Sequence, residues 1–456
     1  MPPGAGMSPK SVFASVALVI ILGSLEKSIV TTPLPLIGQA LNAGAALTWV
    51  VTSYLLAATA VLPVYGKLSD QFGRLRLLNI GLGLFLAGSL ACALAQSLPQ
   101  LLAARVLQGL GGGGLIALAF TVIADTIPPR EVGRYQGYIS AVYAVSSIAG
   151  PLLGGYFAEH LSWRWVFWIN LPLGALALWL VNRHLGHLNE RHARRFDWPG
   201  ALLLMLSTTL LLLLLSPDAP LPGHWLAGAL AATLTLLLLR ERQARDPILP
   251  PQLARQSGYL VSVLLILIAQ MLMFALLVYL PLQMQWQEGM GPAESGRTMV
   301  IFMASITAGA FSAGKLIARR GRYKGFVLTG FALAALALWL IHLGEAAALA
   351  LVLAGLGLGL TLPALSVVVQ NALLPQDRGI GMSLFNFGRE LGGALGVALC
   401  AILFHLPLPP GSLAGYAREE LSLGFATTYL GMAALATLAM LLTLLALRRR
   451  ELSPHP

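Results

Sequence analysis

The sequence predicts an all-α membrane protein whose chain crosses the bilayer many times. Hydrophobic residues make up 57% of the 456 residues and charged residues only 10%, whereas a soluble domain carries about 25% charged residues. The apolar residues form runs of about 20, which is the length of a membrane-spanning helix. These runs are rich in Leu, Ala and Gly and lack the period-two alternation of membrane strands. Helices are therefore expected to satisfy the backbone in lipid, rather than a closed barrel.

Fourteen spans are expected along the chain. Prolines 217, 220 and 222 with Gly223 separate the seventh span from the eighth, so these two are expected to form a tight hairpin. The first span has an acidic residue at its centre, which distinguishes it from the uncharged core of a cleavable signal peptide. The expected spans are 12–38, 46–66, 77–96, 99–125, 136–158, 164–183, 198–216, 223–239, 258–283, 297–317, 325–343, 346–370, 378–404 and 424–447.

The distribution of charge predicts the orientation of these spans. With the N-terminus inside, 23 of the 29 Lys and Arg residues fall in the inner segments and three in the outer loops. This bias is the positive-inside rule, so both termini are expected in the cytoplasm of a multi-pass inner-membrane protein. The same rule explains the net charge of +11 without nucleic-acid binding. Cys92 and Cys400 each lie within an apolar run, so neither a disulfide nor a metal site is expected.

The chain repeats a short motif about 250 residues apart. The segment GKLSDQFGR at 66–74 aligns with GKLIARRGR at 314–322. Both copies lie where one span ends and a short basic turn leads into the next. Two parallel halves are a known transporter architecture. We expect a six-helix bundle at 1–190, an inserted hairpin with its flanking loops at 191–250, and a second six-helix bundle at 251–456.

Five motifs in chain order carry a family resemblance. They are the 66–74 loop, the segment LEKSIVTTPLP at 25–35, Arg105 with Gln108 and Gly109, GPLLGG at 150–155, and WRWVFWINLPLG at 163–174. With them the chain resembles the major facilitator superfamily and, within it, the fourteen-span drug:proton antiporter family. That family usually has Asp at the position of Glu26. The resemblance implies a major facilitator fold of two six-helix bundles plus an inserted hairpin.

Two motifs are expected to gate the conformational change. The resemblance implies that Asp70 contacts the start of the 378–404 helix, whose N-terminus is partly positive, and that Arg74 pairs with Asp125. Ala318 replaces Asp70 in the second copy, so the same lock is not expected there. Alternatively, the loop is merely solvated and the glycines merely pack helices. The gating candidates are Gly66, Asp70, Gly73, Arg74, Asp125, Gly150, Pro151, Gly154 and Gly155.

Charged residues within spans are costly in lipid and are therefore functional candidates. Glu26 and Glu390 lie roughly 21 Å and roughly 18 Å from the inner ends of their spans at 1.5 Å per residue. Both acids therefore reach the midplane, where transporter sites lie. An apolar surrounding favours the protonated form of a carboxylate, so the proton-coupling candidates are Glu26, Arg105 and Glu390. Arg105 needs a charged partner and is expected to face Glu26 across the bundle, and the resemblance implies a role of this arginine in proton coupling. Alternatively, Glu26 forms only a static ion pair with Arg105 or Lys27, and Glu390 is neutralised by Arg389 or Lys27.

Polar and aromatic residues within the spans are candidates for a substrate cavity. Asn386 and Glu390 are four residues apart and share one helix face. The substrate-binding candidates are Glu26, Lys27, Tyr54, Gln108, Gln270, Asn386, Phe387, Arg389 and Glu390. Each can alternatively be an ordinary helix-packing residue.

These observations predict a transporter rather than an enzyme. The expected function is proton-coupled efflux of amphipathic, cationic or zwitterionic compounds by alternating access, with antibiotic resistance as its consequence. The first alternative is a flippase or exporter of a lipid or lipid-linked glycan. An exporter of a particular metabolite or siderophore is another, and a membrane receptor or scaffold that transports nothing is the alternative from a different class. The expected partners are a small substrate, protons and the bilayer, with no nucleic acid, no cofactor and no metal, and a monomer is expected. The GxGxxG spacing of Gly109, Gly111 and Gly114 lies within a span and follows no strand, so it does not indicate a dinucleotide site.

Overall fold

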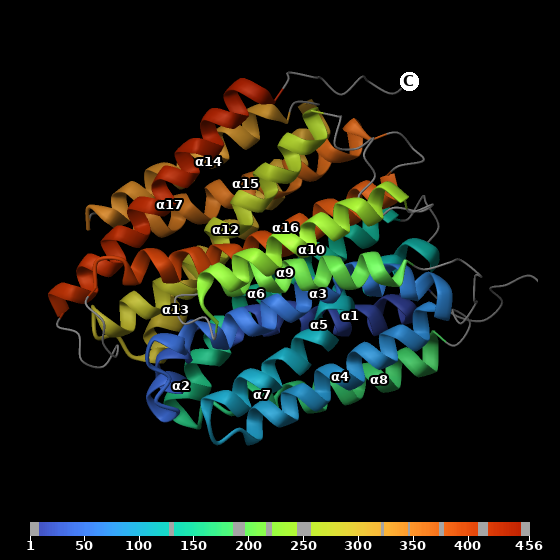
Figure 1. Cartoon of the computed structure of the whole chain (residues 1–456), viewed down its shortest axis with the longest axis horizontal. Coiled ribbons are helices and arrows are strands. Elements are labelled where there is room, and N and C mark those ends of the chain that lie inside the picture. The colour runs from blue at the N-terminus through green and yellow to red at the C-terminus, as the bar shows by residue number, and fades with distance from the viewer. Residues whose placement is uncertain are drawn as a thin grey trace, which may run out of the picture. The chain divides into compact units, whose positions relative to one another are not determined.

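The regular structure of the chain is helical in every segment that the computed structural model describes (Figure 1). These segments are residues 9–126, 132–185, 197–215, 221–243, 257–320, 323–344, 347–373, 378–408 and 418–447. The chain divides into two compact units, which are residues 1–209 with 291–296 and residues 210–290 with 297–456. The predicted division into two bundles and a separate hairpin stays a prediction.

The first unit is built around α1 and α5. Helix α5 packs along both α3 and α4, and α1 contacts α5, α6 and α8. Figure 1 shows α4, α5 and α8 running side by side. The elements of this unit are α1 (Pro9–Ile29), α2 (Leu34–Ala40), η1 (Gly44–Thr48), α3 (Trp49–Phe72), α4 (Arg74–Leu94), α5 (Leu98–Thr126), α6 (Val132–His160), α7 (Trp165–Trp168), α8 (Asn170–His184) and most of α9 (Trp198–Leu214).

The second unit is built around α12 and α14. Helix α14 contacts α15 and α17, and α12 contacts α15, α16 and α17. The first residues of α13, up to Gly296, are grouped with the first unit. The elements are α10 (Gly223–Gln243), α12 (Ser257–Trp286), α13 (Pro292–Arg320), α14 (Lys324–His342), α15 (Ala347–Ala372), α16 (Arg378–His405) and α17 (Arg418–Ala446).

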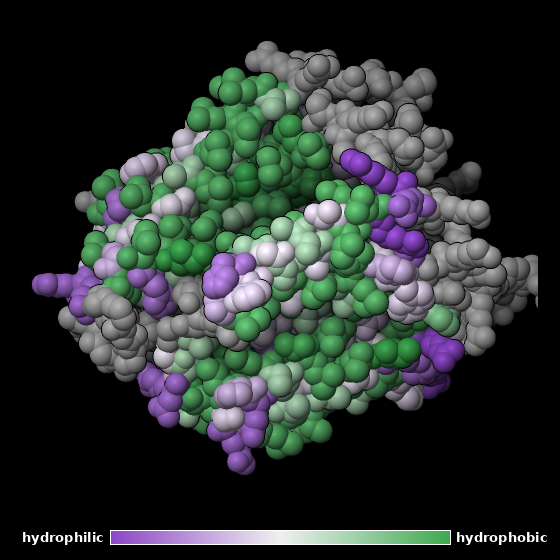
Figure 2. Space-filling model, viewed as in Figure 1, coloured by the Kyte–Doolittle hydropathy of each residue, from purple (hydrophilic) through white to green (hydrophobic). Residues whose placement is uncertain are grey.

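The predicted all-α fold class is confirmed, and each expected span coincides with helical structure. Among the described residues, eleven helices are long and apolar enough to cross a membrane, and the apolar stretches Ala46–Leu62 and Trp198–Leu214 are shorter. Apolar side chains cover most of the described helices in the view of Figure 2. Such a surface is compatible with lipid and not with water. The number of fourteen crossings stays a prediction.

Two expected spans are not single helices. The span predicted at 12–38 is broken at Val30–Pro33, where α1 ends and α2 begins. Pro33 and Pro35 cause the break, because proline donates no backbone hydrogen bond and disfavours helical geometry at the preceding residue. The span predicted at 164–183 is divided at Ile169 into α7 and α8. The break at Ile169 is explained by Pro172, which has no backbone N–H to donate to the carbonyl oxygen of Trp168, four residues earlier. Helix α6, in contrast, continues through Pro151.

The glycines of α5 allow two neighbouring helices to approach closely. A Cβ on Gly109 would lie 2.5 Å from the carbonyl oxygen of Tyr54 on α3. A Cβ on Gly111 would lie 2.6 Å from the carbonyl oxygen of Gly81 on α4. Small residues at helix interfaces are a feature of packing in membranes. The GxGxxG spacing therefore positions α5 against α3 and α4.

Candidate functional site

A buried ion pair lies in the interior of the first unit. Arg105 of α5 donates to Oε1 of Glu26 on α1, and both residues are 1% exposed. The same guanidinium donates from Nε to the carbonyl oxygen of Val50 at 2.9 Å and from Nη1 to Oε1 of Gln108 at 2.5 Å. It also lies 4.4 Å from the ring centroid of Tyr54, within cation–π range. Three further neighbours, Val50, Gln108 and Tyr54, therefore hold the arginine while it pairs with Glu26.

The second carboxylate oxygen of Glu26 is bound by a residue of α8. Nδ2 of Asn170 donates to Oε2 of Glu26 at 2.8 Å and to Oγ of Ser89 at 3.2 Å. Nε2 of Gln108 donates to the same Ser89 oxygen at 2.8 Å. Glu26, Arg105, Gln108, Ser89 and Asn170 thus form a closed ring of hydrogen bonds, here named the Glu26 cluster. All five are buried.

The ring is compatible with burial because its ionised groups are paired and hydrogen-bonded. An unpaired charge in an apolar interior costs several kcal/mol. Here the positive and negative charges cancel, and each carboxylate oxygen accepts at least one hydrogen bond. Arg105 and Gln108 are three residues apart and share one face of α5. Three other helices, α1, α4 and α8, contribute the remaining members.

The structure brings together four of the residues that the sequence singled out, namely Glu26, Tyr54, Arg105 and Gln108. Lys27 is half-buried on α1. Asn170 and Ser89 were missed by the sequence analysis. Asn170 carried a detectable signal, since it is an amide within the apolar segment WINLP. Ser89 carried none, because a serine in a membrane helix often bonds its own backbone.

The second unit holds the other polar candidates. Gln270 of α12 is 5% exposed, and α12 packs on α16. On α16, Nη2 of Arg389 lies 3.5 Å from Oε1 of Glu390, at the long limit of a hydrogen bond. Asn386 and Phe387 are half-buried on the same helix. The side chain of Glu390 is 13% exposed, so it is less enclosed than Glu26.

The loop motif places Gly73 between α3 and α4. Gly73 has φ of +92°, a conformation that favours glycine. Nη1 of Arg74 donates to Oγ of Ser69 at 2.6 Å. The surroundings of Gly66 and the side chains of Asp70 and Asp125 lie outside the described part of the structure. The expected contacts of Asp70 with the 378–404 helix and of Arg74 with Asp125 therefore stay predictions.

The GPLLGG segment of α6 packs closely on its neighbours in the first unit. Gly150 faces Ser28, and Gly154 faces the backbone of Ile29 at the end of α1. A Cβ on Gly155 would lie 2.5 Å from the carbonyl oxygen of Pro292, in the part of α13 grouped with this unit. These glycines allow backbone-to-backbone approach, as expected for either a packing or a gating role.

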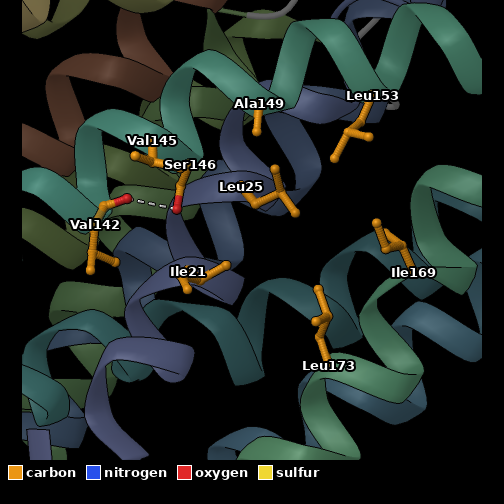
Figure 3. Close-up of a pocket in the computed structure, with 9 residues that line it drawn as sticks. All are labelled: Ile21, Leu25, Val142, Val145, Ser146, Ala149, Leu153, Ile169 and Leu173. Carbon is orange, nitrogen blue, oxygen red and sulfur yellow. Dashed lines mark hydrogen bonds between the residues drawn. The ribbon is translucent and has the colours of Figure 1, made fainter. Parts of the chain in front are cut away.

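An apolar groove lies between α1, α6 and α8, with a volume of about 390 Å³ (Figure 3). Ile21 and Leu25 line it from α1, and Ile169 and Leu173 line it from the start of α8. Five residues of α6 between Val142 and Leu153 complete the lining. Its one hydroxyl, on Ser146, donates to the carbonyl oxygen of Val142 at 2.9 Å. The lining therefore offers apolar contact only. Leu25 and Ile169 are sequence neighbours of Glu26 and Asn170.

The long apolar helices define a polytopic membrane protein. The family model described as Major Facilitator Superfamily matches residues 16–397. The chain belongs to this superfamily, whose members are transporters rather than enzymes.

Two similar relatives are named as multidrug proteins, and a third is named as an uncharacterized transporter. Multidrug resistance protein 3 of Bacillus subtilis (strain 168) is 32% identical over 67% of this chain and 61% of its own length. Multidrug transporter protein MdtP of the same strain is 30% identical over 84% of this chain and 73% of its own length. An uncharacterized MFS-type transporter of Mycobacterium tuberculosis (strain ATCC 25618 / H37Rv) is 32% identical over 86% of this chain. The match spans 59% of that relative's length.

Solved structures share the fold. A bacterial homolog of the human lysosomal transporter Spinster, in an inward-facing and unoccupied conformation, matches with a TM-score of 0.68 and 15% identity. The match covers 99% of this chain and 100% of that chain. A D-xylose-proton symporter matches with the same TM-score and identity over 97% and 99% of the two chains. At this identity the likeness shows the fold alone.

Proposed function

We propose that the protein is a proton-coupled multidrug antiporter of the fourteen-span drug:proton antiporter family. It resides in the inner membrane with both termini in the cytoplasm and exports amphipathic cationic or zwitterionic compounds. The observation that supports this proposal is the buried Glu26–Arg105 ion pair within a closed hydrogen-bonded ring. The names of the two Bacillus subtilis relatives support multidrug transport.

The charge of the Glu26 cluster explains how exchange would work. With Glu26 ionised, Arg105 and Glu26 sum to zero charge. A proton on Glu26 leaves the charge of Arg105 uncompensated, which disfavours a cationic substrate nearby. Proton and cation therefore compete, and binding of one promotes release of the other. Alternating access then converts this competition into antiport.

Proton release on substrate binding tests the proposal. We expect purified wild-type protein in weakly buffered detergent to release protons when a cationic dye is added. In Glu26→Gln the release is expected to vanish, because the amide carries no exchangeable carboxyl proton. A pH indicator in solution measures the release. Glu419→Gln, at an exposed carboxylate at the start of α17, serves as the matched control and should behave like wild type. Undiminished release from Glu26→Gln would contradict the role of Glu26.

A lipid or lipid-linked glycan flippase is the second candidate. The observation that favours it is the groove between α1, α6 and α8, whose lining suits an acyl chain. Reconstituted protein that moves a fluorescent phospholipid between leaflets, with no dye-induced proton release, would support this candidate over the antiporter.

A further inference from the structure

Only the nitrogen of the Asn170 side-chain amide is hydrogen-bonded among the described residues. Its Nδ2 donates twice, to Oε2 of Glu26 and to Oγ of Ser89. Its Oδ1 is buried and has no hydrogen-bond partner among the described residues. Asn170 is 0% exposed. A buried acceptor without a partner costs about 1–3 kcal/mol, so an unused acceptor beside a carboxylate needs a physical reason.

The two protonation states of Glu26 require opposite partners. An ionised carboxylate accepts hydrogen bonds only, whereas a protonated carboxyl group also donates one. The present arrangement, with Nδ2 facing Oε2, suits the ionised state. After protonation at Oε2, two donors would face each other. Rotation of the amide about its Cβ–Cγ bond exchanges Nδ2 for Oδ1, which then accepts from the new hydroxyl.

Ser89 permits this exchange because its hydroxyl both donates and accepts. In the present arrangement its oxygen accepts from Asn170 and from Gln108. When Oδ1 replaces Nδ2, the Ser89 hydroxyl can donate to Oδ1 while it still accepts from Gln108. Both orientations of Asn170 are therefore compatible with the ring.

We propose that Asn170 is a positioning residue that stabilises both protonation states of Glu26 by turning its amide. This inference rests on the proposed role of Glu26 in proton exchange. Other ionisable groups facing Glu26 are Arg105 of α5 and, through Gln108, the thiol of Cys92 on α4. Tyr54 of α3 stacks on Arg105, and Lys27 adjoins Glu26 on α1. Helix α6 also packs on α1. There the contacts are made by Gly150 and Gly154, which carry no ionisable group.

The test is the pH dependence of dye-induced proton release. In Asn170→Leu, the ionised state of Glu26 loses a hydrogen bond that leucine cannot replace. The protonated state loses a hydrogen bond as well, but a weaker, neutral one of about 0.5–1.5 kcal/mol, against about 1.5–3 kcal/mol for the bond to the charged group. We therefore expect the midpoint of release to move to higher pH by about one unit, which equals 1.36 kcal/mol. Asn182→Leu is the matched control. Asn182 lies on α8, as Asn170 does, and its substitution removes two exposed hydrogen bonds to Asn79 of α4. It should leave the midpoint unchanged.

A spectroscopic measurement keeps the proposal testable if Asn170→Leu does not fold. In infrared difference spectra of wild-type protein, protonation of Glu26 should shift an asparagine carbonyl band to lower frequency, and carbonyl-labelled asparagine identifies the band. Asn182→Leu should retain that shift. Absence of the shift, or an unchanged midpoint in folded Asn170→Leu, would overturn the role of Asn170. If wild type itself releases no proton, the proposed function fails instead.

Discussion

Replacement of Arg105 by methionine is expected to destabilise the protein by about 3–5 kcal/mol, the cost of removing one partner of a buried ion pair. The carboxylate of Glu26 would lose its charged partner in the interior, where both groups are 1% exposed. It would then remain unpaired or take up a proton from solvent. Methionine keeps the length of the side chain and limits the change in packing. Unfolding in mixed micelles titrated with SDS measures the loss.

A double-mutant cycle separates the ion pair from packing. In the Glu26→Gln background the Glu26 cluster holds no negative charge, so Arg105→Met should cost distinctly less than in wild type. Arg164→Met is the control for loss of an arginine. Arg164 donates to the carbonyl oxygen of Ala95 at 2.9 Å and is only partly buried, so about 1 kcal/mol is expected. Equal costs of Arg105→Met in both backgrounds would contradict a stabilising charge pair.

The membrane fold could be predicted from the sequence because its main signal is local. Runs of apolar residues of fixed length predict spanning helices one at a time, and helical structure lies at each predicted span. The breaks at Val30–Pro33 and Ile169 were missed, although Pro33, Pro35 and Pro172 are visible in the sequence. Proline is tolerated in membrane helices, as α6 illustrates with Pro151. Its presence alone therefore does not distinguish a break from a continuous helix.

The candidate site was predictable only where single residues were conspicuous. Glu26 and Arg105 stand out as charges within apolar runs, and their need for compensation made a contact between them the expected one. Asn170 lies 144 residues from Glu26 in the chain. Its place in the ring depends on how α8 packs against α1, which no local pattern specifies. The same holds for Ser89, which joins Asn170 to Gln108.

Replacement of Gly111 by alanine is expected to destabilise the first unit by about 1–3 kcal/mol, the usual cost of overpacking. A Cβ at this position would lie 2.6 Å from the carbonyl oxygen of Gly81 and 2.8 Å from Cα of Phe85. Both are backbone atoms, so no side-chain rotation relieves the clash and α4 must move away from α5. Helix α4 carries Ser89, and α5 carries Arg105 and Gln108. The displacement therefore also lengthens the hydrogen bond between Ser89 and Gln108 in the Glu26 cluster.

Gly83→Ala provides the matched control on the other side of the same helix pair. A Cβ on Gly83 would meet nothing within 4 Å, and the residue is exposed on α4. Alanine there should be neutral or stabilise by up to about 1 kcal/mol, because glycine is the poorer helix former. Unfolding in mixed micelles compares the two variants, and dye-induced proton release reports on the cluster. If Gly111→Ala matched Gly83→Ala in stability and in proton release, the Glu26 cluster would not depend on the close approach of α4 and α5.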